Sequence, residues 1–117
     1  IFDGAAPGLR GAGVRVIHLD NHRNLIAYVR WHADRPDDPV LVVANFSAVD
    51  YDTEACPVPF PSPGAWYCHF NSDSSRYAPD FRDLGADRVE AVGEPPGTAL
   101  RIGRYSLQIF SRHPPAP

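Results

Sequence analysis

The stretch Val40-Leu41-Val42-Val43-Ala44-Asn45-Phe46-Ser47 decides the fold class of this chain. It is an unbroken apolar run, rich in β-branched valine, that ends abruptly in polar asparagine and serine. Two aspartates and Pro39 stand directly before it. An apolar run of this length between turn-forming residues predicts a strand that is buried on both faces.

A first hairpin is predicted on the N-terminal side of this run. Residues 14–19 alternate weakly between apolar and polar, and residues 20–24 have the composition of a turn. Residues 25–31 then alternate with a period of two, which predicts a strand. One side of that strand carries Leu25, Ala27, Val29 and Trp31, and the other carries Ile26, Tyr28 and Arg30.

The segments on either side of the run are more polar. Residues 32–39 contain two prolines and are predicted to form a loop, whereas residues 48–56 suggest a weaker strand with Tyr51 and Ala55 facing inward. From Pro57 to Pro63, proline occupies every second position. Because proline cannot donate a ladder hydrogen bond, this segment is expected at an edge or in an extended connection.

The C-terminal half continues as short extended runs. Residues 65–70 predict a strand with Trp66, Cys68 and Phe70 on one face and Tyr67 and His69 on the other. Residues 71–85 form the longest irregular stretch, and residues 94–97 predict a turn. Further strands are predicted over residues 87–92, 99–102 and 105–110. No segment shows helical spacing and the connections are short, so we predict an all-β, antiparallel, Greek-key-like β-sandwich of about seven or eight strands.

Composition limits the possible partners and the number of domains. With 117 residues the chain is expected to be one domain. A net charge of -3 without a basic stripe argues against nucleic acid, and no apolar run approaches the roughly 18 residues of a membrane span. The lack of methionine suggests a processed chain or part of a longer one, so the compartment is open, with the cytoplasm favoured. We expect residues 1–12 to be a tether, 13–112 the sandwich and 113–117 a frayed tail.

The two cysteines, Cys56 and Cys68, are too few for a disulfide scaffold. They lie almost symmetrically about the turn at residues 61–64, so a bond across two strands is sterically conceivable. Buried free thiols that pack as small apolar groups are the expected alternative.

Residues that could carry catalysis or bind a cofactor do not form a recognisable pattern. The acidic candidates are Asp37, Asp38, Asp50, Asp52, Glu54, Asp73, Asp80 and Asp83. All fall in segments expected to be loops or outer strand faces, which favours solvated surface acids. The histidines lack compact metal-ligand spacing, and no nucleophile elbow or phosphate-binding glycine loop is present. We therefore expect no catalytic residue, no metal and no cofactor.

Aromatic side chains are the remaining candidates for ligand binding, because a sugar ring can pack on their flat faces. Trp31, Trp66 and Phe70 follow the inward alternation and are expected in the core. Tyr67, Tyr77 and Phe81 are the better candidates for carbohydrate contacts, and two of them lie in the long irregular stretch.

The chain resembles the C-terminal all-β domain of the α-amylase superfamily, glycoside hydrolase family 13, and most of all that of α-glucan branching enzymes and their amylase-like relatives. The resemblance covers roughly residues 9–112. The segments that carry it, in order, are Leu41-Val42-Val43-Ala44-Asn45-Phe46-Ser47, Pro63-Gly64-Ala65-Trp66, Phe70-Asn71-Ser72-Asp73, Tyr77-Ala78-Pro79-Asp80-Phe81 and Gly103-Arg104-Tyr105-Ser106-Leu107.

This resemblance implies an antiparallel sandwich that packs against a catalytic (β/α)-barrel of the same polypeptide, and the barrel holds the catalytic acids. It assigns no catalytic residue to this chain. Asn71-Ser72-Asp73 would be a strand-end turn whose side chains satisfy backbone groups. One apolar face of the sandwich would then be exposed in the absence of the barrel.

Three hypotheses for function remain open at the level of sequence. The first is a non-catalytic accessory domain that stabilises the barrel of an α-glucan-active enzyme. The second is a carbohydrate-binding module that contacts α-glucan through Tyr67, Tyr77 or Phe81. The third is a generic immunoglobulin-like interaction domain.

Overall fold

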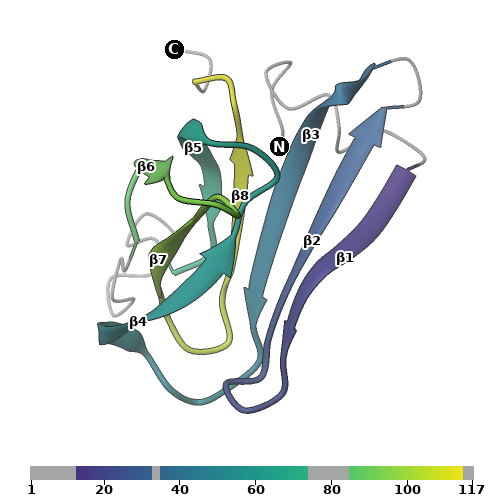
Figure 1. Ribbon diagram of the computed structural model, residues 1–117. Helices are drawn as coiled ribbons and strands as arrows, with labels where there is room; N and C mark the ends of the chain where they lie inside the picture. The colour runs from purple at the N-terminus through teal and green to yellow at the C-terminus, as the bar shows by residue number, and fades with distance from the viewer. Residues whose placement is uncertain (1–12, 33–34, 74–84, 115–117) are drawn as a thin grey trace.

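Eight strands form two facing β-sheets in a computed structural model, which describes residues 13–32, 35–73 and 85–114 (Figure 1). The strands are β1 (Gly13–Asp20), β2 (Leu25–His32), β3 (Arg35–Asn45), β4 (Tyr51–Pro59), β5 (Gly64–Asn71), β6 (Arg88–Ala91), β7 (Gly97–Ile102) and β8 (Leu107–Ser111). The described residues contain no helix. The predicted all-β class is therefore confirmed.

The larger sheet has the strand order β1-β2-β3-β8-β5-β6, and the smaller one pairs β4 with β7; every pair is antiparallel. A bridge between Val92 and Gly97 closes the turn from β6 to β7. β7 pairs with β4 in the smaller sheet, and β8 then returns to the larger sheet, where it lies between β3 and β5.

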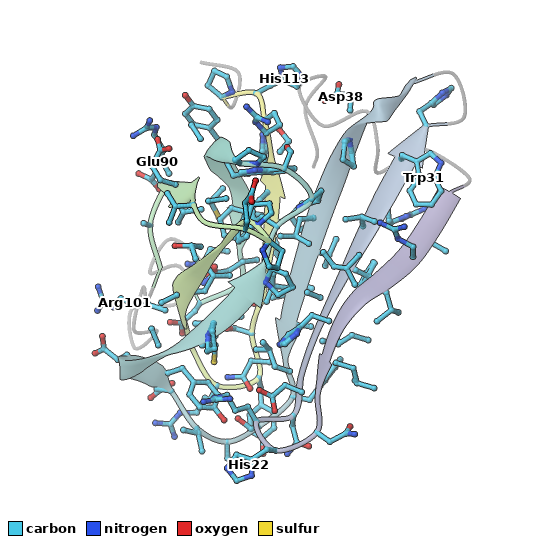
Figure 2. All side chains as sticks on the ribbon, viewed as in Figure 1. His22, Trp31, Asp38, Glu90, Arg101 and His113 are labelled. Carbon is cyan, nitrogen blue, oxygen red and sulfur yellow. The ribbon has the colours of Figure 1, made fainter. Side chains whose placement is uncertain are left out.

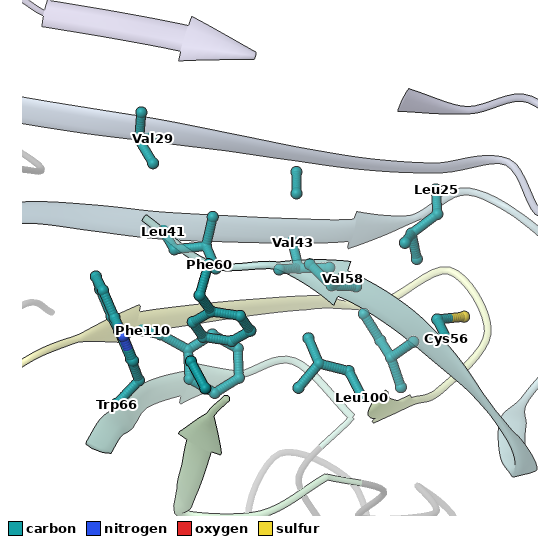
Figure 3. Packing of buried hydrophobic residues seen from close by; sticks show 13 residues of the cluster. Leu25, Val29, Leu41, Val43, Cys56, Val58, Phe60, Trp66, Leu100 and Phe110 are labelled. Atoms are coloured by element: carbon teal, nitrogen blue, oxygen red, sulfur yellow. The ribbon is translucent and has the colours of Figure 1, made fainter. Parts of the chain in front are cut away.

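The core lies between the two sheets and follows the predicted alternation of β2. Leu25, Ala27 and Val29 are buried, and Trp31 packs against the same cluster. Figure 3 shows Leu41 and Val43 of β3 facing Val58 and Phe60. The other members of the cluster are Cys56, Trp66, Ala91, Leu100, Ile102 and Phe110. We call this side of the large sheet its inner face.

β3 is buried on both faces, as its unbroken apolar run predicts. Leu41 and Val43 enter the main core, while Val40 and Val42 form a second cluster with Ile109 of β8. Tyr28, Phe70 and Leu107 pack around this second cluster. β3 lies between β2 and β8, so both of its edges are also paired.

A buried polar network closes the end of β3 and explains the Asn-Phe-Ser sequence. The Asn45 side-chain amide donates to the carbonyls of Val49 at 2.9 Å and Gly103 at 3.0 Å. Its Oδ1 accepts from the backbone N–H of Ser47 at 2.9 Å and from the Ser47 hydroxyl at 2.7 Å. The Asn45 side chain thereby forms hydrogen bonds with backbone groups of two turns, the one that leads to β4 and the one that leads to β8.

The predicted turn after β1 is held by Asp20. Its Oδ1 accepts from the backbone N–H groups of His22 and Arg23, and its Oδ2 pairs with the Arg23 guanidinium at 2.8 Å. These hydrogen bonds, led by the one from the Arg23 side chain, lower the pKa of the Asp20 carboxyl. The expected strand-end turn at Asn71-Ser72-Asp73 is also present, since Asn71 Oδ1 accepts from the Asp73 N–H at 3.0 Å.

The predicted loop over residues 32–39 is wrong, because β3 begins at Arg35. In the pairing of β2 with β3, Arg30 lies opposite Val40 and His32 lies opposite Arg35. Four residues of β3, 36–39, therefore lie opposite a single residue of β2 and form a bulge. A bulge tolerates Pro36 and Pro39, since no ladder hydrogen bond is required from them. Pairing with β2 thus extends β3 through residues whose composition is typical of a loop.

The proline-rich segment is an edge strand, as expected, but its inward side chains differ from the prediction. β4 starts at Tyr51 and runs through Pro57 and Pro59. Tyr51 packs against the core as predicted, whereas Ala55 is only half-buried. Cys56, Val58 and Phe60 alternate with the prolines and fill the core instead. Proline at every second position therefore leaves the inward positions free for apolar side chains.

Two aromatic residues also differ from their predicted positions. Phe70 was expected beside Trp66 and Cys68, but a bulge between Cys68 and Phe70 turns Phe70 to the opposite face, where it packs against the second cluster. Tyr105 was expected in the last strand. It instead lies in the turn before β8, with φ of 47° and 70% of its surface exposed.

Cys56 and Cys68 are free thiols, and Cys56 is fully buried. Burial raises the pKa of the Cys56 thiol from 9.0 to about 11.

In a Cys68→Ser variant, iodoacetamide should therefore alkylate Cys56 only as fast as the chain unfolds. Because the unfolded thiol loses its proton first, stability should fall as pH rises from 9 towards 11. Mass spectrometry of the labelled chain checks both expectations, and rapid labelling under native conditions at neutral pH would contradict them.

Candidate docking surface

The face of the large sheet that points away from β4 and β7 carries exposed apolar side chains, and we call it the outer face. On β1, Val14, Val16 and Leu19 pair with Arg30, Tyr28 and Ile26 of β2. These β2 residues alternate with the buried ones of the core, so all six side chains lie on the outer face. Val14, Val16 and Leu19 are 61%, 54% and 62% exposed.

Phe46 continues this surface at the end of β3. Its N–H donates to the carbonyl of Asn24 at 2.9 Å, which extends the β2–β3 register one residue past the pair Leu25–Asn45. Phe46 follows Val42 and Ala44 in the alternation and therefore lies on the outer face, 66% exposed. Val14, Val16, Leu19 and Phe46 together form what we call the exposed apolar strip.

The arrangement of layers explains why this strip is exposed. β4 and β7 cover the inner face, and within residues 13–32, 35–73 and 85–114 no strand lies over the outer face. The centre of the outer face is closed by the second cluster around Val42, but the β1 margin stays open. Exposed apolar side chains gathered on one face are typical of protein interaction surfaces.

A group of histidine, serine and aspartate side chains near the end of β8 resembles a catalytic arrangement at first sight. His69 Nε2 lies 2.7 Å from the hydroxyl of Ser111, and His113 Nε2 lies 2.9 Å from Asp38 Oδ1. Figure 2 shows His113 and Asp38 together at one end of the sandwich. The acid thus contacts a different histidine from the one that contacts the serine.

The hydrogen bonds of this group exclude an activated serine. His69 Nε2 also lies 2.8 Å from the carbonyl oxygen of His113, which only accepts, so Nε2 carries the proton and donates it. The Ser111 hydroxyl in turn donates to the same carbonyl at 3.0 Å. A base must accept a proton from its nucleophile, and His69 Nε2 cannot do so here. We conclude that these residues fasten the segment after β8 to β5 and β3.

The acidic candidates whose side chains the structure describes are paired with basic side chains or buried: Asp38 contacts His113, Asp50 and Asp52 contact arginines, and Asp73 is buried. Asp50 pairs with Arg104 at 2.8 Å, and Asp52 contacts Arg101 Nε at 2.7 Å. The hydrogen bond that the Arg104 guanidinium donates to the Asp50 carboxylate raises the pKa of Arg104. Glycoside hydrolysis instead needs two carboxyl groups that face a shared substrate. Asp80 and Asp83 lie outside the described residues, as do the side chains of Asp37 and Glu54.

The structure places one of the three candidate sugar-binding residues. Tyr67 is half-buried on β5, with Arg88 of β6 as its register partner, and faces away from Trp66 and the core. Tyr77 and Phe81 lie outside the described residues, so the proposed grouping of the three aromatics stays a prediction.

Sequence reasoning did not single out the exposed apolar strip. The signal was present in Val14 and Val16, whose alternation matches that of β2.

Neither a metal cluster nor a membrane helix is found in the part of the chain that the structure describes. No three histidine, cysteine, aspartate or glutamate side chains there are grouped so as to hold a metal ion. The same residues contain no helix with the length and apolar character needed to cross a membrane.

Comparison with known proteins agrees with this architecture. The family model described as "Alpha amylase, C-terminal all-beta domain" matches residues 16–112. The chain is also similar to the 1,4-alpha-glucan branching enzymes GlgB of Pseudomonas putida and Rhodopseudomonas palustris. It is 36% identical to the first over 95 residues and 39% identical to the second over 88 residues. These alignments cover 78% and 74% of the chain but only 12% of each enzyme.

The family match removes the alternative of a generic immunoglobulin-like domain. It covers every strand from β2 to β8 and most of β1. It also agrees with the resemblance seen in the Asn-Phe-Ser segment that ends β3, where Asn45 builds the buried turn network. This chain belongs to the α-amylase C-terminal all-β domain family.

Proposed function

We propose that this chain is the non-catalytic C-terminal domain of an α-glucan-active enzyme of the branching-enzyme or α-amylase type. In this proposal, the catalytic (β/α)-barrel of the same polypeptide covers the exposed apolar strip. The observation that carries the proposal is the strip itself, because apolar side chains exposed together on one face are typical of a surface that another domain covers. The similarity to branching enzymes, of which the chain spans about 12%, supports a larger polypeptide as the partner.

The role of the domain follows from the energetics of the strip. Covering a valine or leucine side chain contributes about 1.5–3 kcal/mol relative to leaving it in water. Several such side chains on one face would couple the stability of the sandwich to that of the barrel. The engaged acids and the proton-donating His69 support a structural role for this domain, with catalysis in the barrel.

A paired substitution tests this proposal. Val14→Asp with Val16→Asp should change the stability of the isolated chain by less than about 1 kcal/mol, because both side chains are already exposed. In the full-length enzyme, the same pair should lower the unfolding temperature and increase proteolysis between the domains. Calorimetry and limited proteolysis of both forms measure this difference.

Val92→Asp is the matched control, since Val92 is 67% exposed but lies in the turn after β6. It should leave the full-length enzyme unchanged. Equal behaviour of the strip variant and the Val92 variant in the full-length enzyme would contradict the proposed docking. The wild-type chain should also bind an apolar dye more strongly than the strip variant.

The carbohydrate-binding alternative through Tyr67, Tyr77 and Phe81 has its own test. Titration of the chain with maltoheptaose, followed by nuclear magnetic resonance, would place any binding site. Chemical-shift changes centred on Tyr67 that disappear in Tyr67→Ala would favour that alternative. A response elsewhere, or none, would count against it.

A further inference from the structure

The turn between β7 and β8 presents an aromatic ring to solvent in a way that packing does not explain. Tyr105 is 70% exposed, more than any other large apolar side chain in the described residues. Its backbone has φ of 47°, a strained conformation that a tyrosine rarely adopts. A turn selected only for stability would place glycine or asparagine at this position.

This unusual backbone is held rigidly by the surrounding turn. The Tyr105 N–H donates to the carbonyl of Ser47 at 3.0 Å, and the carbonyl of the next residue, Ser106, accepts from the N–H of Asn45 at 2.9 Å. The Ser106 hydroxyl donates to the Gly103 carbonyl at 2.6 Å. These hydrogen bonds hold the backbone that carries the ring, so the point from which the ring projects into solvent is fixed before a ligand arrives.

A planar polar pair lies next to Tyr105 in the chain. Arg104 Nη2 contacts Asp50 Oδ2 at 2.8 Å, Nε contacts Oδ1 at 3.3 Å, and the backbone N–H of Arg104 donates to the same Oδ1 at 2.9 Å. The arginine side chain is 57% exposed while that of Asp50 is 11% exposed. Asp50 thus fixes the guanidinium, whose outward N–H groups can donate to a ligand hydroxyl.

We propose that Tyr105, with the Asp50–Arg104 pair next to it in the chain, forms a binding platform for a glucose ring of an α-glucan chain. A tyrosine ring offers apolar area to the C–H face of a sugar, and the guanidinium offers donors to the hydroxyls at its edge. The choice of α-glucan as the ligand rests on the proposed function. This platform is separate from the candidates Tyr67, Tyr77 and Phe81, and it uses no residue of the exposed apolar strip.

Tyr105→Gly tests the platform without loss of the fold, because glycine adopts a positive φ at no steric cost. The melting temperature of this variant should stay the same or rise. Its affinity for maltoheptaose should fall about tenfold or more, since one stacking ring is lost. Tyr105→Phe should keep most of the affinity, because it keeps the ring.

Two control variants are needed. One distinguishes the loss of the aromatic ring from the change in backbone conformation, and the other distinguishes this site from the candidate site at Tyr67. Asn24→Gly relieves a positive φ of 55° at the second such residue, other than glycine, in the described ranges, and should leave binding unchanged. Tyr67→Ala removes a surface aromatic on β5 and should also leave binding unchanged. Binding that survives Tyr105→Gly, or that is lost only in Tyr67→Ala, would overturn the proposal.

The ligand class and the proposed function are tested by separate measurements. Cellohexaose should bind the wild-type chain more weakly than maltoheptaose, and equal affinities would overturn the assignment to α-glucan. No chemical-shift change at Tyr105 with maltoheptaose up to about 10 mM, the range of a very weak complex, would overturn the platform itself. In that case a loss of interdomain stability in the Val14→Asp and Val16→Asp variant would still uphold the proposed function.

Discussion

Replacing Trp66 with alanine is expected to destabilise the isolated chain by about 4 kcal/mol. The Trp66 side chain is fully buried, and its ring meets that of Phe60 edge to face with 5.5 Å between centroids. Phe60 in turn meets Phe110 at 5.6 Å, so the loss of Trp66 leaves a cavity beside two further rings. Marginal stabilities of about 5–15 kcal/mol are typical, so much of the total would be lost.

Trp66 also connects the core to the surface, which adds to the expected effect. Its indole N–H donates to the Ser62 carbonyl at 2.9 Å, and the Arg112 guanidinium lies 5.6 Å from its ring centroid. Urea unfolding of the variant measures the change in free energy. Trp31→Ala is the matched control, since Trp31 is only half-buried and should cost clearly less. A loss below about 1 kcal/mol for Trp66→Ala would show that the core between the sheets is not closed as described.

Replacing Asn45 with alanine is expected to cost about 3 kcal/mol, although the change removes no apolar contact of note. The Asn45 side chain is buried and bonds to Val49, Gly103 and Ser47. Alanine would remove the partner of the buried Ser47 N–H and one of the hydrogen bonds to the carbonyls of Val49 and Gly103, although the Gly103 carbonyl would keep its hydrogen bond from the Ser106 hydroxyl. A buried polar group that is left without a partner costs about 1–3 kcal/mol. Because the network joins two turns, the ends of β3 and β7 should loosen together.

Asn21→Ala is the control for this substitution, because Asn21 is exposed in the first turn and its loss should change stability by less than about 0.5 kcal/mol. Hydrogen exchange adds a local test. In Asn45→Ala, the amides of Ser47 and Tyr105 should exchange faster than those of β5. Unchanged protection at these two amides would contradict the role of the network.

Much of the candidate docking surface could have been found in the sequence, but its function could not. The alternation in β1 and β2 assigns Val14 and Val16 to the face opposite Leu25 and Val29. It does not say which face of the sheet receives the second layer. That depends on β4 and β7, which cross from the large sheet to cover one side of it.

The unusual position of Tyr105 could not have been predicted for a related reason. Its segment alternates like a strand, and nothing local in Gly103-Arg104-Tyr105-Ser106 demands a positive φ. The conformation is imposed by hydrogen bonds to Ser47 and Asn45, more than fifty residues away in the chain. The bulge that turns Phe70 towards the outer face is likewise set by pairing with β8.

The order of apolar and polar residues was enough to predict the all-β class, the burial of β3 on both faces and the inward face of β2. These features follow from hydrophobic periodicity, which is a local property of the chain. Only the tertiary structure decided that β3 extends through its prolines, that Phe70 turns outward and that the β1 margin stays open. Those outcomes depend on which strands pair across long separations, and a register change of one residue moves a side chain to the other face.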